Sequence, residues 1–182
     1  PRFRLDAEVL RDQALYVSGL LNTVDSGKGF KPYQPTGIWE ALGFLESNTS
    51  RYVQDKGNVI YRRSLYLFWK RTSPHPMMLS FDAPMRESCS VRRSRTNTPL
   101  QALVTMNEPM FVESARVFAE RLLKLKADDK VRLAKLFEIC LSRPASESDL
   151  NLLQKSLAFY QKDFQKPGVS FDILAAGDSK PD

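Results

Sequence analysis

The chain has 182 residues, and its 27 Lys and Arg residues outnumber its 21 Asp and Glu residues, which gives a net charge of +6. With 42% hydrophobic and 26% charged residues, the composition is that of ordinary globular material with one core. It contains no apolar run of about eighteen residues, so no transmembrane segment is predicted. The sequence begins at Pro1 without an initiator Met or a signal peptide, and we therefore expect it to be a fragment of a longer polypeptide.

The N-terminal part is predicted to hold one helix and then a long loop. A helix is expected over residues 6–21 because apolar side chains recur there at helical spacing. These positions are Leu10, Ala14, Val17 and Leu21. Residues 22–37 contain three glycines and two prolines with little periodicity, which predicts a long loop. A short helix is expected near residues 38–45.

The aromatic segment at residues 59–71 admits two structures. A helix would place Tyr61, Leu65 and Phe68 on one face, whereas the continuous run of apolar and aromatic residues is also typical of a strand. We favour the helix. After it, the prolines between residues 72 and 84 limit regular structure to a turn or two.

The C-terminal half carries clearer helix signals. Thr98 is a candidate N-cap and Pro99 suits the first helical position, so a helix is predicted from Pro99 to Met106. Three further helices are predicted, beginning near Phe111, Asp128 and Ser146. Their expected core positions are Phe111, Ala115, Phe118, Leu122 and Leu125; Val131, Ala134, Phe137 and Leu141; and Leu150, Leu153, Leu157, Tyr160 and Phe164. Ser146 and Asp149 resemble a capping box.

These elements predict a mainly α protein, an irregular helical bundle with long loops in its N-terminal half. Short connections between the later helices favour antiparallel neighbours. We expect a single domain over residues 1–166, the C-terminal part of a larger protein, and a weakly ordered tail over residues 167–182.

The cysteines and the histidine give no catalytic or metal-binding pattern. Cys89 and Cys140 have no CxxC spacing, and two buried thiols are favoured over a disulfide. His75 is the single histidine, so a metal centre or a His-based triad would lack its usual partners. We therefore expect no metal and no cofactor in this fragment.

Positive charge is concentrated in the middle of the chain. Residues 62–95 contain eight cations and two acids, a net charge of +6 in this window alone. Planar guanidinium groups bind oxyanions in a bidentate manner, and the helix start at Pro99 would add backbone donors. The candidate residues for binding an anion or a partner are Arg62, Arg63, Trp69, Arg86, Arg92, Arg93, Arg95, Asn97 and Gln101.

Two other interpretations of this arginine cluster stay open. The arginines could instead cross-link loops and helices through carbonyl oxygens and through Asp82, Glu87 or Glu113. Catalysis would require a base, an acid or a nucleophile near the cations, and Asp82, Glu87 and Cys89 are the candidates in the same window. The sequence alone does not decide whether the protein is an enzyme.

Several motifs resemble one known family. They are Tyr61-Arg62-Arg63-Ser64-Leu65-Tyr66, Phe81-Asp82-Ala83-Pro84, Asn107-Glu108-Pro109 and, most specifically, Arg92-Arg93-Ser94-Arg95-Thr96-Asn97-Thr98-Pro99-Leu100-Gln101. The chain is similar over residues 4–160 to the planctomycete-type, cytochrome-associated domain of unknown function 1553.

This resemblance implies a context and no reaction. Members look like C-terminal parts of large extracytoplasmic bacterial proteins that often carry a cytochrome-like domain upstream, so any haem of the parent protein would bind outside this fragment. The expected partners are upstream domains of the same polypeptide, with anionic polysaccharide as a further candidate, and nucleic acid is not favoured as a ligand.

We therefore expect a non-catalytic accessory or interaction module of an extracytoplasmic, cytochrome-bearing protein, which docks an anionic ligand or a partner domain through its arginine-rich surface. The alternatives are part of an enzyme that acts on sulfated or uronic polysaccharide and, second, a nucleic-acid-binding domain.

Overall fold

The structure is a computed structural model that describes residues 4–42, 46–47, 49–166, 168 and 172–181. Its described residues form six α-helices and three 3₁₀ turns without a named strand, which confirms a mainly α fold. The α-helices are α1 (Ala7–Ser18), α2 (Pro76–Ser80), α3 (Pro99–Asn107), α4 (Pro109–Leu123), α5 (Asp129–Leu141) and α6 (Glu147–Phe164). The 3₁₀ turns are η1 (Gly57–Tyr61), η2 (Ser64–Tyr66) and η3 (Asp172–Ala175).

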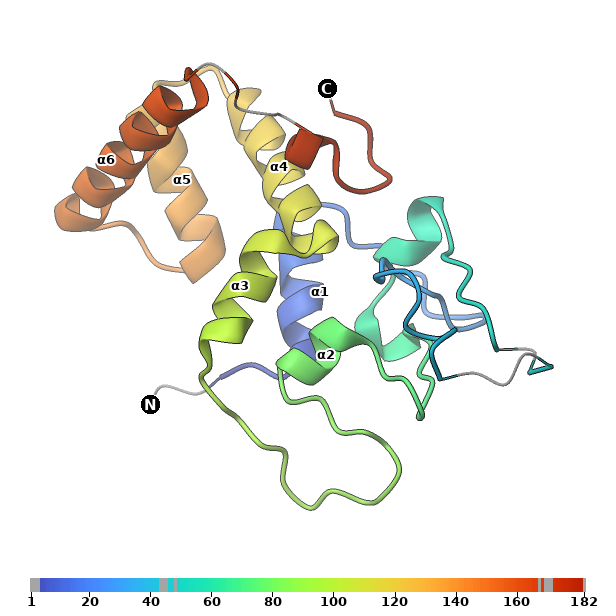
Figure 1. Cartoon of the computed structure of the whole chain (residues 1–182). Helices are drawn as coiled ribbons and strands as arrows, with labels where there is room; N and C mark the ends of the chain where they lie inside the picture. The colour runs from blue at the N-terminus through green and yellow to red at the C-terminus, as the bar shows by residue number, and fades with distance from the viewer. Residues whose placement is uncertain (1–3, 43–45, 48, 167, 169–171, 182) are drawn as a thin grey trace.

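Helices α1 and α4 pack against each other and form the centre of the molecule (Figure 1). Helix α1 ends at Gly19, whose φ of 87° is left-handed and whose N–H caps the carbonyl oxygens of Leu15 and Tyr16. Helix α4 is preceded by its N-cap Glu108, whose side chain accepts hydrogen bonds from the backbone N–H groups of Met110 and Phe111. The buried core between them and the N-terminal segments includes Leu15, Phe30, Ile60, Leu67 and Met78.

The aromatic segment is neither of the two structures considered from the sequence. It forms η1 and η2, and each turn is followed by an extended residue that bridges the preceding loop, Arg62 with Asn22 and Leu67 with Phe30. The N–H of Phe30 donates to the carbonyl oxygen of Tyr66 at 2.9 Å. The helix prediction for residues 59–71 is wrong because the segment forms only short 3₁₀ turns, and its remaining backbone pairs with the loop at residues 22–30.

The short helix expected near residues 38–45 lies partly outside the described residues. Residues 38–42 form hydrogen-bonded turns and contain no helix, with the N–H of Ala41 donating to the carbonyl oxygen of Gly37. Trp39 in these turns is buried against Tyr52 and Phe68.

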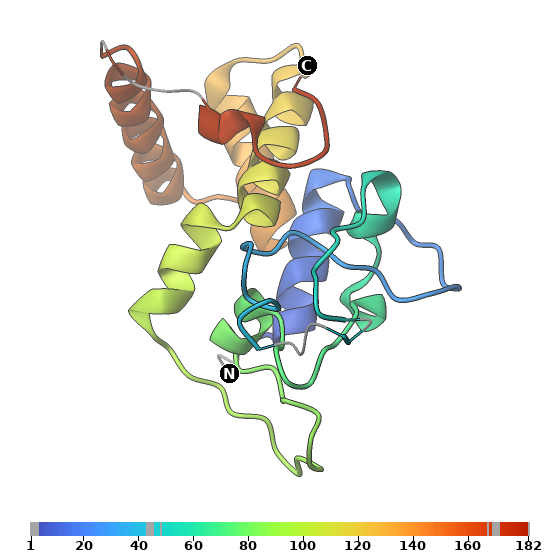
Figure 2. The same ribbon diagram turned by 45° about the vertical axis from the view of Figure 1, so that its right-hand side comes forward.

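Helices α5 and α6 form a hairpin on the outside of the molecule, as Figures 1 and 2 show. The predicted capping box is present, because Ser146 accepts from the N–H of Asp149 and the Asp149 carboxylate accepts from the N–H of Ser146. Phe137 is buried as expected, but Val131 and Leu141 are exposed. None of the described residues of α6 is fully buried, and Tyr160 and Phe164 are exposed, because α6 packs chiefly against α5.

None of the helices in the described part of the chain is both long and apolar enough to cross a membrane. The thiols of Cys89 and Cys140 are free, as favoured, but Cys89 is exposed instead of buried. The order of the tail in solution stays a prediction; in the structure, its η3 turn contacts α4.

Candidate functional site

The candidate site is centred on the long connection from α2 to α3, which we call the arginine loop and define as residues 85–98. The loop carries Arg86, Arg92, Arg93 and Arg95, and every one of its residues is exposed. Both ribbon views show it reaching away from the helices (Figures 1 and 2). Two residues near its start, Asp82 and Arg86, have φ angles of 60° and 63°, which turn the chain out of α2.

Ion pairs attach the arginine loop to the start of α1. Arg93 lies 2.7 Å from the carboxylate of Glu8, and Arg95 lies 3.4 Å from Asp6. Arg86 lies 3.9 Å from Glu8. Asp6 is the N-cap of α1 and Glu8 is in its first turn, where the helix dipole also favours negative charge. The three arginine side chains are 37–48% exposed, so each pair contributes about 1 kcal/mol or less after solvent screening.

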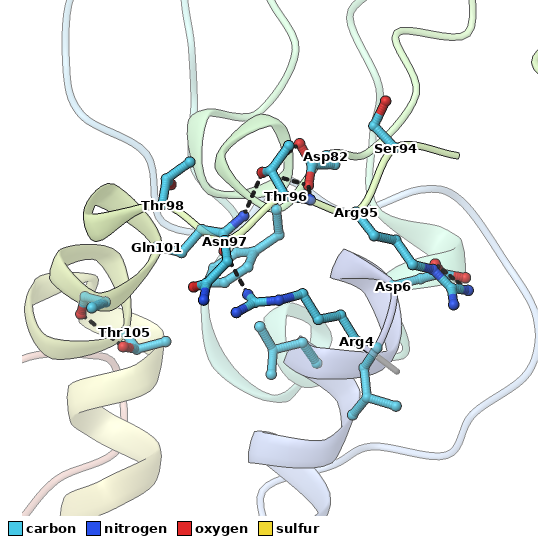
Figure 3. Close-up of a pocket in the computed structure, with 14 residues that line it drawn as sticks. Arg4, Asp6, Asp82, Ser94, Arg95, Thr96, Asn97, Thr98, Gln101 and Thr105 are labelled. Atoms are coloured by element: carbon cyan, nitrogen blue, oxygen red, sulfur yellow. Dashed lines mark hydrogen bonds and ion pairs between the residues drawn. The ribbon is translucent and has the colours of Figure 1, made fainter. Parts of the chain in front are cut away.

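A polar pocket of about 340 Å³ lies between the arginine loop, the start of α1 and α3 (Figure 3). A chain of hydrogen bonds runs along it. Arg4 donates to the side-chain oxygen of Gln101 at 2.8 Å, and Gln101 donates to the hydroxyl of Thr96 at 3.1 Å. Thr96 in turn donates its backbone N–H to Asp82 at 2.6 Å.

The pocket holds two cations and two carboxylates. Its cations are Arg4 and Arg95, and its acids are Asp6 and Asp82. Each carboxylate is already engaged, Asp6 by Arg95 and Asp82 by Thr96. Asn97 also lines the pocket and is exposed. This arrangement can present guanidinium and amide donors to an anionic group, and neither carboxylate is poised as a free base.

The structure divides the nine predicted site residues into three groups. Arg92, Arg93, Arg95, Asn97 and Gln101 lie in or beside the pocket, and Arg92 has no ion pair among the described residues. Trp69 and Arg86 form a second group at the start of the loop. The Arg86 guanidinium lies 4.5 Å from the centre of the Trp69 ring, and the ring N–H donates to the carbonyl oxygen of Met85 at 3.0 Å.

Arg62 and Arg63 form the third group, which lies between η1 and η2 and contacts the loop at residues 22–30. Arg62 is buried and donates to the backbone carbonyl oxygens of Val24, Ser26 and Lys28. Its guanidinium also lies 4.2 Å from the centre of the Tyr66 ring. Arg62 thus cross-links a loop, as the structural interpretation of the arginines expects, whereas Arg63 is exposed beside Asp25.

Sequence reasoning missed the acidic residues that complete this surface. Glu8 and Asp6 lie 85 and 89 residues from their partners Arg93 and Arg95 in the sequence, and no local pattern pairs them. The signal that could have suggested them is the pair of acids at the start of a helix, whose carboxylates would attract a basic loop.

A second cavity, of about 560 Å³, lies between α3 and the segment around α2. It is lined mainly by apolar residues, together with His75 and Glu108. His75 is buried, and its Nε2 lies 2.6 Å from the carbonyl oxygen of Tyr33, so Nε2 donates and Nδ1 carries the lone pair of the neutral ring. Burial lowers the pKa of His75 to about 4 and raises the pKa of the Glu108 carboxyl to about 7.

Comparison with known proteins gives a family and no neighbour of known activity. Among the curated proteins and among the solved structures, none matches this chain. One family model matches residues 1–157 and therefore spans α1 to α5, the arginine loop and most of α6. The chain belongs to PSD1, a family of proteins of unknown function (DUF1553).

Proposed function

We propose that the chain is a non-catalytic accessory or interaction module of an extracytoplasmic, cytochrome-bearing bacterial protein, and that it docks an anionic ligand or an acidic partner domain through the arginine loop. The observation that carries the proposal is the placement of four arginines on one continuous exposed loop, Arg86, Arg92, Arg93 and Arg95. The extracytoplasmic and cytochrome context rests on the sequence resemblance.

The exposed ion pairs of the arginine loop support the proposal that anionic groups of a partner can replace the acids of α1. Arg93 and Arg95 are held by Asp6 and Glu8, yet their side chains are 37% and 48% exposed. Carboxylates or sulfates of a partner can replace these acids without the cost of exposing a buried charge. Arg92 adds a cation that is not engaged in an ion pair within the described residues. The acids at the start of α1 thus hold the loop in place while its arginines stay exposed to a partner.

The pocket beside the loop favours a second candidate function, part of an enzyme that acts on sulfated or uronic polysaccharide. Arg4, Arg95 and Asn97 line a cavity that also contains the carboxylates of Asp6 and Asp82, which combines anion recognition with acids. The engagement of Asp82 by Thr96 argues for the docking module over the enzyme, because a general base must be able to accept a substrate proton.

Fluorescence anisotropy with three labelled probes tests the proposal. The probes are a glutamate oligomer, a sulfated oligosaccharide and single-stranded DNA, each measured at about 50 mM and about 300 mM salt because exposed charge interactions are screened by salt. The test variant is R92A/R93A/R95A. The control is K126A/K130A/K155A, which removes the same charge from exposed lysines outside the loop.

We expect the glutamate oligomer or the sulfated oligosaccharide to lose about tenfold or more in affinity with the loop variant, a loss of about 1.4 kcal/mol, and to keep its affinity with the lysine control. An equal loss in both variants would show nonspecific attraction to net charge and would overturn the proposal. Turnover of the sulfated oligosaccharide would move the enzyme alternative ahead, and preference for DNA would favour the nucleic-acid alternative.

A further inference from the structure

A buried carboxylate on α4 is completed by a segment from the C-terminal end of the chain. Glu113 is fully buried, and its Oε1 accepts hydrogen bonds from the hydroxyl of Tyr61 at 2.7 Å and from the N–H and hydroxyl of Ser179, each at 2.7 Å. Its Oε2 accepts from the hydroxyl of Tyr33 at 2.8 Å. Two of the four donors to this carboxylate therefore come from one residue of the tail.

The same tail segment makes further polar contacts around Glu113. The N–H of Asp178 donates to the hydroxyl of Tyr33 at 2.7 Å. Arg116 donates to both the carbonyl oxygen and the hydroxyl of Ser179, at 2.6 and 2.7 Å. The Asp178 carboxylate accepts from the N–H of Gly57 at 2.7 Å. Residues 177–179 are thus held through their backbone, one hydroxyl and one carboxylate, and main-chain hydrogen bonds of this kind supply affinity in peptide recognition.

Gly177 sets a steric requirement. Its φ is +93°, a conformation that favours glycine, and a Cβ added there would overlap the Glu113 carboxylate. The hydroxyl and N–H of the residue two positions later both reach that same carboxylate. The contacts therefore select a glycine followed two residues later by a serine.

The residues that contact the tail, Tyr33, Tyr61, Glu113 and Arg116, form the receiving side, and each is also positioned by parts of the fold other than the tail. Tyr33 and Tyr61 belong to the main hydrophobic core, and the Tyr33 backbone is held by His75. Glu113 and Arg116 lie on α4, and Arg116 is also paired with Glu120 at 2.6 Å. All of these residues fall within the 1–157 span that the family model matches, whereas residues 172–181 lie beyond it. Figures 1 and 2 show the C-terminal segment lying along the outside of α4.

We infer that Tyr33, Tyr61, Glu113 and Arg116 form a peptide-binding site for Gly-Xaa-Ser segments, which residues 177–179 of the same chain occupy as a displaceable strap. The site is separate from the arginine loop and its ligand is a short peptide turn. Because the strap is tethered, its effective concentration at the site is about millimolar, and a free peptide must compete with it.

Releasing the strap in the full chain tests this inference. The variant G177V introduces a side chain that the site has no room for, and it leaves every residue of the receiving side unchanged. Amide hydrogen exchange at residues 176–180 should then increase. A fluorescein-labelled peptide with the sequence of residues 174–181 should bind G177V with an affinity at least about tenfold higher than it binds the wild type, in which the strap already occupies the site.

Two matched controls define the specificity. The same peptide with alanine at the position of Ser179 should bind G177V at least about fivefold more weakly, because it lacks the hydroxyl that contacts Glu113 and Arg116. Adding Tyr33→Phe to G177V should weaken binding of the unaltered peptide in the same way, since Phe keeps the ring and removes the hydroxyl. Should G177V fold poorly, S179A in the full chain provides a second route to a weakened strap.

Equal affinity of the peptide for the wild type and G177V would overturn the inference, because the strap would then not occupy the peptide's site. Absence of saturable binding to a folded G177V chain would overturn it as well, and would make residues 177–179 a fixed part of the fold.

Discussion

The guanidinium of Arg11 donates to the backbone carbonyl oxygen of Arg62 at 2.9 Å, so one buried arginine fixes the segment that carries another. Arg11 also bonds the carbonyl oxygen of Ile60 and the hydroxyl of Ser64. Burial lowers its pKa to about 10, which still leaves it charged at neutral pH. Arg62 then extends outward to the carbonyl oxygens of Val24, Ser26 and Lys28.

Arg11→Met should destabilise the fold by about 3 kcal/mol or more, because the carbonyl oxygens of Ile60 and Arg62 lose a charged donor in a buried setting. Urea unfolding of the two proteins would measure the difference. Gln13→Met, on the exposed side of the same helix, is the matched control and should change stability by less than about 0.5 kcal/mol. Equal stability of Arg11→Met and the wild type would contradict the role assigned to Arg11.

Replacement by alanine should destabilise the fold strongly at Arg62 and hardly at all at the neighbouring Arg63. Arg62→Ala removes a buried side chain that bonds three carbonyl oxygens, and we expect a loss of about 3 kcal/mol. Arg63 is exposed and lies 3.7 Å from an exposed Asp25, so Arg63→Ala should stay within about 0.5 kcal/mol of the wild type. Thermal unfolding of both variants checks the contrast, and similar melting temperatures would refute it.

These arginines also show how far the sequence could predict the structure. Cap signals and apolar periodicity located α3 to α6, because those helices are determined by local sequence. The prediction for the aromatic segment at residues 59–71 was wrong because the structure of this segment depends on Arg11 and on the loop at residues 22–30, which are distant in sequence. The high density of arginine is visible in the sequence. Which arginine is buried, such as Arg62, and which is exposed, such as Arg93, depends on the tertiary fold and could not be predicted.

The free energy of unfolding should depend on pH through His75 and Glu108, two side chains of the second cavity whose contributions change in opposite directions as pH rises. For His75, with a folded pKa of about 4 and an ordinary pKa of about 6.5, stability is fully present above the ordinary value and is lost as pH falls toward 4. For Glu108, with a folded pKa of about 7 and an ordinary pKa of about 4.3, stability is fully present at low pH and is lost as pH rises toward 7.

Between about pH 4.5 and 6.5 these two contributions nearly cancel in the wild type. His75→Gln should remove one of them, so that stability falls with rising pH by up to about 1.4 kcal/mol per pH unit. Glu108→Gln, whose amide oxygen can still cap α4, should give a rise of the same size. Urea unfolding at several pH values in this window measures both slopes. If both variants kept the slope of the wild type, neither group would be shifted as described.

Phe137 of α5 and Phe159 of α6 should differ sharply in their effect on stability. Phe137 is 9% exposed, and Arg143 lies over its ring at 4.5 Å, so Phe137→Ala should cost about 3 kcal/mol through lost burial and a new cavity. Phe159 is 65% exposed, and Phe159→Ala should cost less than about 1 kcal/mol. Thermal unfolding of the 182-residue chain distinguishes these values. A cost at Phe159 that equals the cost at Phe137 would mean that the outer face of α6 is covered in solution, because only a buried ring loses that much on truncation.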